Sequence, residues 1–259
     1  VSFEREPSYF GASVVEGTDH RTVVCRDMHS LGRIVGMGSR ATRLCWVNGA
    51  QHRVGYLSGL RIRAEYRGVG LLARGYDLLR QIHQQDPLPF YLTTCAAGHE
   101  GAWRVLWSGG AGLPDYQHLC DYVSVAIPLS RQSRTVPLPR TAGRHQLRLA
   151  TRDDVPELVE FWKRCGRKRD FFPVYDCSDF DTDDGMLRGM RPEDVLLAHW
   201  GGKLVGTLAA WDQSAFRQSV VHEYGPRLAC LRPVINGLAR LRGRVGLPSP
   251  GERLNLVFA

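Results

Sequence analysis

Arg67, Gly68 and Gly70 are residue types that together could bind an anion. The first turn of a helix carries backbone N–H groups without intrahelical acceptors, and the helix dipole places partial positive charge there. Glycines let the backbone turn sharply and approach a ligand, and an arginine adds a fixed positive charge suited to phosphate oxygens. If a helix begins just after these residues, they are predicted to bind two linked phosphates.

A strand before this loop and a helix after it would position these residues. Residues 54–62 are rich in Val, Tyr, Leu and Ile, which predicts a mostly buried strand ending at Arg63. From residue 69 or 70 onward, apolar residues recur at the spacing of one buried helical face, namely at Leu71, Leu72, Leu78, Leu79 and Ile82. The predicted order is strand, short glycine loop and helix.

Known phosphate-binding motifs narrow the choice of ligand. Gly68, Gly70 and Ala73 match the dinucleotide pattern Gly-x-Gly-x-x-Gly only in its looser form, and the Gly-Lys-Ser/Thr of nucleoside-triphosphate loops is absent. The stretch from Tyr66 to Leu72 resembles the coenzyme A loop of the GNAT superfamily of N-acetyltransferases, Arg/Gln-x-x-Gly-x-Gly/Ala, which commonly follows an aromatic residue. Arg67 and Gly70 match this pattern, whereas Leu72 departs from its final Gly or Ala.

Neighbouring segments agree with this resemblance. Thr22–Arg26 and Arg33–Ala41 predict one hairpin, and Leu44–Val47 followed by Asn48-Gly49 predicts a second. Phe90–Cys95 would be a fifth strand, parallel to the one ending at Arg63. The resemblance implies a GNAT-like α/β (α+β) fold with a mixed, mainly antiparallel central sheet flanked by helices. In that fold the two parallel strands splay apart and admit the pantetheine arm.

Three shorter segments complete the first part of the chain. Ser8–Val15 and His99–Trp107 are predicted to be short helices. Asp121–Leu129 is predicted to be a last strand, because its apolar residues alternate with polar ones.

Length and composition indicate two domains. The chain has 259 residues, and its 43% of hydrophobic residues is typical of a globular protein. Residues 131–144 are basic and contain prolines, so we expect a linker there. It would separate a first GNAT-like domain at residues 1–130, with the acetyl-CoA site, from a second, partial and degenerate one at residues 145–259.

An internal repeat supports two units in tandem. Gly202–Gly206 repeats the pattern of Gly32–Gly36, and each follows an apolar strand. A strand at Leu147–Ala150 and a helix capped by Thr151 have no counterpart near residue 1, so we expect the chain to lack about 25 residues at its start. Leu254–Ala259 stops within a predicted strand, so we also expect the loop and helix of the second unit to be missing.

The resemblance implies acetyl-CoA as cosubstrate and assigns residues to it. Backbone N–H groups of Leu60, Arg61 and Ile62 would polarise the thioester carbonyl. The pyrophosphate would contact a continuous stretch, Arg67, Gly68, Val69, Gly70, Leu71 and Leu72. The activity implied is direct attack of a primary amine on the acetyl thioester.

The general acid and base do not follow from the resemblance. Trp107 stands where many GNAT members carry a tyrosine that acts as the general acid. Glu100 stands near the position of the asparagine that binds the pantetheine in those members. Tyr116 and Tyr122 are candidate acids, with a core or rim position as the alternative for each. The candidate bases, acting through water, are His52, His99 and Glu65.

By the same resemblance, the acceptor would be a primary amine of a small molecule or peptide. The resemblance also makes a homodimer of this protein possible. The acidic stretch Asp176–Asp184 would suit a cationic acceptor, with a solvated loop as the alternative. Residues 223–246 combine arginines with one apolar helical face, which indicates a packed helix more than a nucleic-acid contact.

Composition bounds the remaining classes. The net charge of +8 favours polyanionic ligands, and the seven cysteines form no Cys-x-x-Cys pair, as expected for a reduced, cytoplasmic protein. No apolar run reaches the ~18 residues of a membrane span. Two alternatives to the enzyme stay open: an acyl-CoA binding or sensor protein without turnover, and a basic nucleic-acid binding protein.

Overall fold

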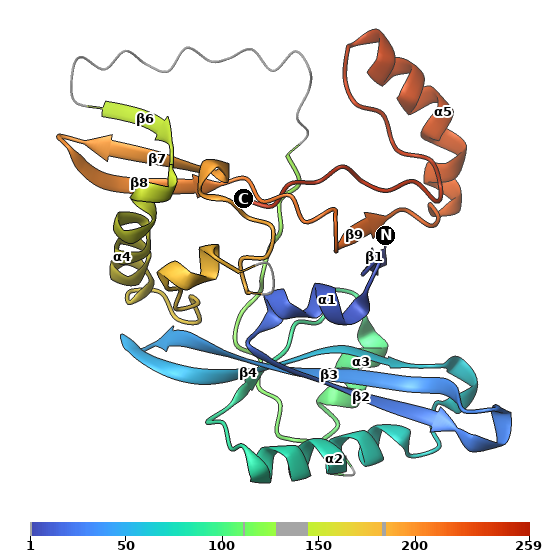
Figure 1. Ribbon diagram of the computed structural model, residues 1–259. Coiled ribbons are helices and arrows are strands. Elements are labelled where there is room, and N and C mark those ends of the chain that lie inside the picture. Colours follow the sequence, from blue (N-terminus) through green and yellow to red (C-terminus); the bar gives the residue numbers. More distant parts are fainter. Residues whose placement is uncertain (1, 111, 128–144, 183–184) are drawn as a thin grey trace. The chain divides into compact units, whose positions relative to one another are not determined.

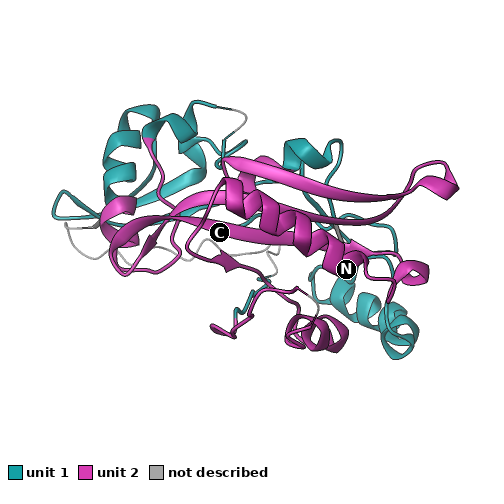
Figure 2. Cartoon of the chain, turned by 90° about the horizontal axis from the view of Figure 1, so that it is seen from below, with its two compact units in different colours: residues 1–12, 122–161, 177–259 teal, residues 13–121, 162–176 magenta. Residues whose placement is uncertain are grey.

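The computed structural model describes residues 2–110, 112–127, 145–182 and 185–259. The chain divides into two compact units, shown in different colours in Figure 2. Unit 1 contains residues 1–12, 122–161 and 177–259, and unit 2 contains residues 13–121 and 162–176. The expected linker, residues 131–144, lies outside the described residues. Each unit is described by itself below.

The centre of unit 2 is a four-stranded sheet in the order β2-β3-β4-β5. Strands β2 (Asp19–Asp27), β3 (Arg33–Val47) and β4 (Ala50–Ile62) are antiparallel (Figure 1). Asn48 and Gly49 form the turn between β3 and β4 with φ of 51° and 77°, as a two-residue hairpin turn requires. Both predicted hairpins are confirmed, and the separate strand segments expected at 33–41 and 44–47 form one strand.

Strand β5 is much shorter than predicted. Only Tyr91–Leu92 pairs, in parallel with Gly55 and Tyr56 of β4, whereas the sequence predicted a strand over 90–95. Gly55 makes room for the Tyr91 ring, because a Cβ on that glycine would lie 2.1 Å from a ring carbon. The mixed, mainly antiparallel sheet that the sequence predicted is confirmed, with a fifth strand that stops early.

Helices cover this sheet. Helix α2 (Leu71–Gln85) follows the 3-10 turn η3 (Ala64–Tyr66) and lies along one face of the sheet (Figure 1). Helix α3 (Glu100–Leu106) is capped by the His99 side chain. The turn η1 (Val14–Glu16) precedes β2 and reaches Ser58 of β4 through a hydrogen bond from the Ser58 hydroxyl. The predicted helices after residue 69 and over 99–107 are confirmed.

The strand predicted over 121–129 does not form in its described part. Residues 121–127 have no regular structure, and Val123, Val125 and Ile127 are 76–78% exposed. Alternating apolar residues identify the face that a strand would bury, but they do not supply a neighbouring strand to pair with. The described residues offer this segment no such neighbour.

Unit 1 contains a three-stranded antiparallel sheet. Strands β6 (His145–Leu149), β7 (Val195–Trp200) and β8 (Lys203–Ala209) lie in that order. Helix α4 (Val155–Gly166), whose residues from 162 onward belong to unit 2, follows the turn η4 (Arg152–Asp154), whose capping box joins Thr151 and Asp154. The strand predicted at 147–150 and the helix start at Thr151 are confirmed. The repeated glycine motif has the same place in both units. Gly32–Gly36 lies at the start of β3 in the β2-β3 hairpin, and Gly202–Gly206 lies at the start of β8 in the β7-β8 hairpin.

The rest of unit 1 is a small sheet with helices around it. Strand β1 (Ser2–Glu4) pairs with β9 (Gln218–Val220), and α1 (Tyr9–Ser13) follows β1. The helix that the apolar spacing predicted forms as α5 (Pro226–Leu241), with Pro233 inside it. The expectation that it is packed is wrong, because none of its residues is buried. In the described part of the chain, no helix has the length and apolar character that crossing a bilayer requires.

Candidate functional site

The loop between β4 and α2 has the backbone that the glycines predicted. Gly68 and Gly70 have φ of 82° and 77°, a left-handed conformation that residues with a side chain rarely adopt. Gly70 is the N-cap of α2 and provides no side-chain cap. The first turn of the helix therefore keeps N–H groups that a ligand can use.

Several amides of this loop are unpaired. In the part of the chain that the structure describes, the N–H groups of Gly68, Val69 and Gly70 have no hydrogen-bond acceptor, and all three residues are exposed. The Arg67 N–H donates to the Ala64 carbonyl at 3.2 Å, and its Nε donates to the Ile62 carbonyl at 3.4 Å. The arginine thus stays next to three free donors, which is a suitable arrangement for phosphate oxygens.

A hydrogen bond between turns holds this loop in place. The Tyr66 hydroxyl donates at 2.5 Å to Asp27, the last residue of β2, where the turn to β3 begins. This bond is the main reason why the pKa of Asp27 lies below its usual value, with Ser30 and the His29 amide as further donors. The loop is therefore attached to the sheet at its first residues, while residues 68–70 stay accessible.

The second feature is an open edge on β4. Gly36 pairs with Ile62 and Ser39 with Ser58, so β4 carries one more residue than β3 over this stretch. This β-bulge contains Gly59, whose φ is 65°, and Leu60. Beyond Leu57, whose carbonyl accepts a bond from the Thr93 hydroxyl at 2.9 Å, no described residue pairs with this edge of β4.

The bulge decides which amide points toward the open edge. The Arg63 N–H donates to Val35 of β3 at 2.9 Å, and backbone groups of successive strand residues point to opposite sides. The N–H of Ile62 therefore points away from β3, toward the open edge, whereas that of Arg61 points toward β3. Leu60 lies in the bulge itself. Of the three predicted carbonyl-polarising amides, Ile62 has the orientation that this role requires.

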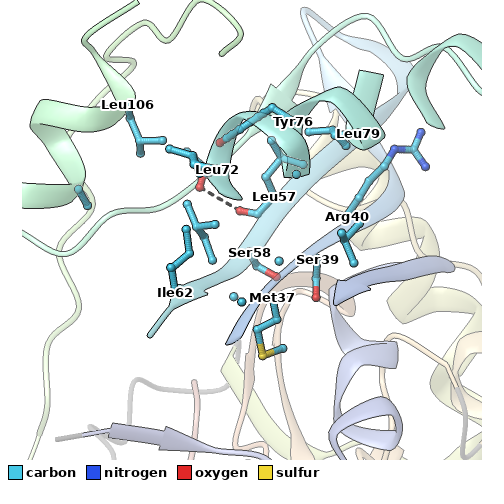
Figure 3. A pocket seen from close by; sticks show the side chains of 18 of the residues that line it. Met37, Ser39, Arg40, Leu57, Ser58, Ile62, Leu72, Tyr76, Leu79 and Leu106 are labelled. Carbon is cyan, nitrogen blue, oxygen red and sulfur yellow. Dashed lines mark hydrogen bonds between the residues drawn. The ribbon is translucent and has the colours of Figure 1, made fainter. Parts of the chain in front are cut away.

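A cavity of about 320 Å³ lies between this edge and helix α2. Figure 3 shows Leu72, Tyr76 and Leu79 of α2 on one side of β4 and Met37, Ser39 and Ser58 on the other. Thr93 to Ala96, after β5, also line it. The volume is in the range of small-molecule sites, and most of the lining is apolar with a few hydroxyls. All of its lining residues belong to unit 2.

The two candidate tyrosines differ in position. Tyr116 lines the cavity, and its hydroxyl lies 2.6 Å from that of Tyr76. Burial, followed by this hydrogen bond, raises the pKa of Tyr116 far above its usual range. Tyr122 is 83% exposed, on the irregular segment that belongs to unit 1. The structure therefore places Tyr116, but not Tyr122, at the cavity.

The candidate bases also separate. His99 lines the cavity, although its Nδ1 accepts the Ala102 N–H at 3.4 Å as a helix cap. Glu65 lies in η3, 3.8 Å from Arg33, and His52 is on β4 opposite Cys45. Neither of these two lines the cavity. Glu100 is the first residue of α3, and Trp107 directly follows its last residue.

Sequence reasoning missed one carboxylate at this site. Glu16 of η1 is 7% exposed, and its Oε2 accepts the Ser58 hydroxyl at 2.9 Å and lies 3.5 Å from Nε2 of His20. Ser58 itself lines the cavity. A buried carboxylate bonded to a cavity residue is a candidate functional group.

Apart from Asp176, the acidic stretch predicted to attract a cationic acceptor belongs to unit 1. Its described part includes η5 (Cys177–Phe180) and Asp181, which forms an ion pair with Arg152. Residues 183 and 184 lie outside the described residues. Within the described ranges, no group of three or more His, Cys, Asp or Glu side chains could hold a metal ion.

No family model matches the sequence, and no curated protein matches it. Several of the solved structures similar to this chain are acetyltransferases. An acetyltransferase from Trypanosoma brucei has 19% identity, covering 40% of this chain and 69% of its own, with a TM-score of 0.30. Aminoglycoside 6'-N-acetyltransferase from Acinetobacter haemolyticus has 16% identity, covering 44% and 76%, with a TM-score of 0.34. AAC(6')-Iy, in complex with a CoA bisubstrate analogue, has 12% identity, covering 44% and 75%, with a TM-score of 0.34.

Proposed function

We propose that this chain is an N-acetyltransferase that moves an acetyl group from acetyl-CoA to a primary amine. One observation carries the proposal: free amides at the start of α2 and an unpaired edge of β4 lie at the two ends of one short loop. Such a loop offers phosphate donors and a backbone donor for a carbonyl within the reach of one extended ligand. The cavity along α2 supplies the space beside that edge.

Each part of the donor has a counterpart in these residues. The pyrophosphate would bind the amides of residues 68–72 and the Arg67 guanidinium. The pantetheine arm would lie along the open edge of β4, and the Ile62 N–H would donate to the thioester carbonyl, where negative charge develops during attack. Leu72 and Leu79 would pack against the apolar part of the arm.

The transfer is a direct displacement. The neutral amine nitrogen bonds to the carbonyl carbon, the carbon–sulfur bond breaks, the nitrogen loses one proton, and the departing thiolate gains one. Tyr116 is our candidate for the donor of that proton, because it lines the cavity and carries a hydroxyl there. The acceptor would be a small-molecule or peptide amine.

Titration calorimetry with acetyl-CoA tests the donor site. Arg67→Glu is expected to weaken binding about tenfold or more, since a charge-assisted bond contributes about 1.5–3 kcal/mol. Lys168→Glu, at an exposed position of unit 2 outside the loop and cavity, makes the same change in charge and should bind like the wild type. Absence of wild-type binding, or equal binding by both variants, would contradict the proposal.

A second function, acyl-CoA binding without turnover, is favoured by two observations. The Tyr116 hydroxyl is already bonded to Tyr76, and Trp107 occupies the position where many GNAT members carry a tyrosine as general acid. Thiol release with a panel of primary amines distinguishes the two functions. Tight acetyl-CoA binding without amine-dependent release would support the binding protein.

A further inference from the structure

The face of the sheet opposite α2 carries a polar group that the donor site does not use. Thr22, Ser39 and Ser58 lie opposite one another on three neighbouring strands, and the hydroxyls of Thr22 and Ser39 are 3.2 Å apart. Buried sheet faces are usually apolar, since unsatisfied polar groups are costly to bury. Of these three hydroxyls, that of Ser58 donates to Glu16.

Glu16 is the charged group at the end of this row. It is 7% exposed and accepts the Ser58 hydroxyl at 2.9 Å, with His20 of β2 at 3.5 Å. Burying a carboxylate is expensive unless it is hydrogen-bonded, and a buried carboxylate beside a cavity is more often functional than one on the surface. Ser58 connects the two, because it both lines the cavity and donates to Glu16.

The same hydroxyl row reaches the open edge of β4. Ser58 is only four residues before Ile62, whose N–H points to that edge, and Ser39 lines the same cavity. In the next row, the Tyr56 hydroxyl lies 2.8 Å from that of Thr94, another cavity residue. An acceptor that enters from this face would meet hydroxyls first and the thioester position next.

We propose that Ser58 contacts the acceptor ammonium and that Glu16, acting through Ser58, accepts its proton. The inference rests on the proposed function and makes the acceptor a cationic primary amine. The Ser58 Oγ takes a proton from the ammonium while its own proton passes to the Glu16 carboxylate, which leaves a neutral amine. That amine attacks the thioester carbon, the carbon–sulfur bond breaks, the nitrogen loses a second proton while the thiolate gains one, and Glu16 later releases its proton to solvent. Ser58 is then a catalytic residue, and Glu16 a positioning residue.

Other titratable and charged groups share this face. They are His20 of β2, Tyr56 of β4 and Arg43 of β3, whose guanidinium carbon lies 5.6 Å from the centre of the Tyr56 ring. Because each of these groups could affect how activity depends on pH, the pH profile of the wild type must be compared with those of variants. His20→Asn is therefore measured beside the Glu16 variants.

The test follows CoA thiol release with acetyl-CoA and spermidine, agmatine or kanamycin from pH 6 to 10. Glu16→Gln should lower kcat/KM for the amine about 100-fold at pH 7, the scale of general base catalysis, with an unchanged acetyl-CoA Kd. The loss should shrink toward pH 10, where solvent deprotonates the amine. Glu16→Asp should restore part of the rate, and Ser58→Ala should reproduce the Glu16→Gln profile, whereas Ser58→Thr should retain activity.

The control is Asp77→Asn, which removes one exposed carboxylate of α2 that does not line the cavity. Its profile should match the wild type. A loss in Glu16→Gln that is equal at every pH indicates a structural role and overturns the inference, as does a profile that changes in His20→Asn but not in Glu16→Gln. Wild-type turnover that Glu16→Gln leaves intact overturns this inference alone. Absence of amine-dependent thiol release in the wild type overturns the proposed function, and this inference with it.

Discussion

Tyr116 and Tyr76 form the closest hydroxyl pair at the cavity, with 2.6 Å between their oxygens. Burial raises the pKa of both, and the hydrogen bond raises that of Tyr116 further while lowering that of Tyr76. Tyr116 is therefore the partner that favours its neutral form more strongly. A neutral phenol can donate a proton to a departing thiolate, whereas a phenolate cannot.

If Tyr116 is the acid, Tyr116→Phe should lower kcat about 100-fold and leave the acetyl-CoA Kd within twofold of the wild type, because the ring stays in place. Tyr76→Phe removes the partner hydroxyl but not the proposed donor, so it should lower kcat less than tenfold. Steady-state kinetics at saturating amine compares the two variants. Equal losses would show that the pair acts only in packing.

At the same scale, Glu16 shows why one site residue was missed. It stands between Val15 and Gly17 in no recognised motif, so the sequence alone does not indicate burial. Gly17 provides the physical reason, since a Cβ there would lie 2.4 Å from the Thr42 carbonyl oxygen. The glycine lets this turn approach β3 closely. A glycine directly after a lone acidic residue was the only signal in the sequence.

Among the elements, those fixed by local chemistry were predictable. The Asn48-Gly49 turn sets a hairpin through backbone conformation, and the helical spacing of leucines sets α2. The β-bulge at Gly59 was not predicted, because its effect depends on the pairing of β4 with β3. The early end of β5 was also missed. Thr93 does not pair with β4 through its backbone; instead, its side-chain hydroxyl donates to the Leu57 carbonyl. Both features depend on contacts that are distant in sequence.

An ion-pair group fastens the end of α2 to the sheet. Arg40 of β3, 1% exposed, donates to the Asp86 carboxylate at 2.8 Å, and Arg53 of β4 donates to the same group at 2.8 Å. These two bonds lower the pKa of Asp86 to about 2, and the bond from Arg53 has the larger effect. The sheet and the helix that border the cavity are therefore held together through one carboxylate.

Because the pKa of Asp86 is lower in the folded state, its contribution to stability should be present above the unfolded pKa of about 3.9 and disappear as pH falls toward 2. Asp86→Asn should lower the unfolding temperature by several degrees at pH 7, since the buried Arg40 loses its closer carboxylate and keeps only that of Asp19, at 3.4 Å. The difference from the wild type should narrow between pH 5 and 2.

Asp77→Asn is the matched control for this change. It breaks the exposed pair with Arg80 on the same helix, and such pairs contribute little to stability. Thermal unfolding followed by circular dichroism measures all three proteins. A difference between Asp86→Asn and the wild type that is constant over this pH range would contradict the assigned role.

At the scale of the whole chain, the cavity and its proposed chemistry lie in unit 2. Residues 162–176 also belong to this unit, where the Trp46 N–H donates to the Phe172 carbonyl at 2.9 Å and the Asn48 N–H to Asp170 at 2.7 Å. A segment that follows α4 in sequence thus supports the hairpin from which β4 starts. Sequence patterns cannot reveal such a pairing, since no local signal connects residues this far apart.

This division predicts where acetyl-CoA changes backbone protection. A ligand that binds only the native state stabilises it by about 2.7 kcal/mol at 100 times its Kd, and hydrogen exchange slows most where new bonds form. In the full chain, protection should increase in residues 58–72 and 93–106, which border the cavity. Peptides from β7 and β8, residues 195–209 of unit 1, provide the internal control and should exchange at unchanged rates. Exchange measured by mass spectrometry at pH 7 with and without acetyl-CoA tests this, and slowing confined to residues 195–209 would place the donor in the other unit.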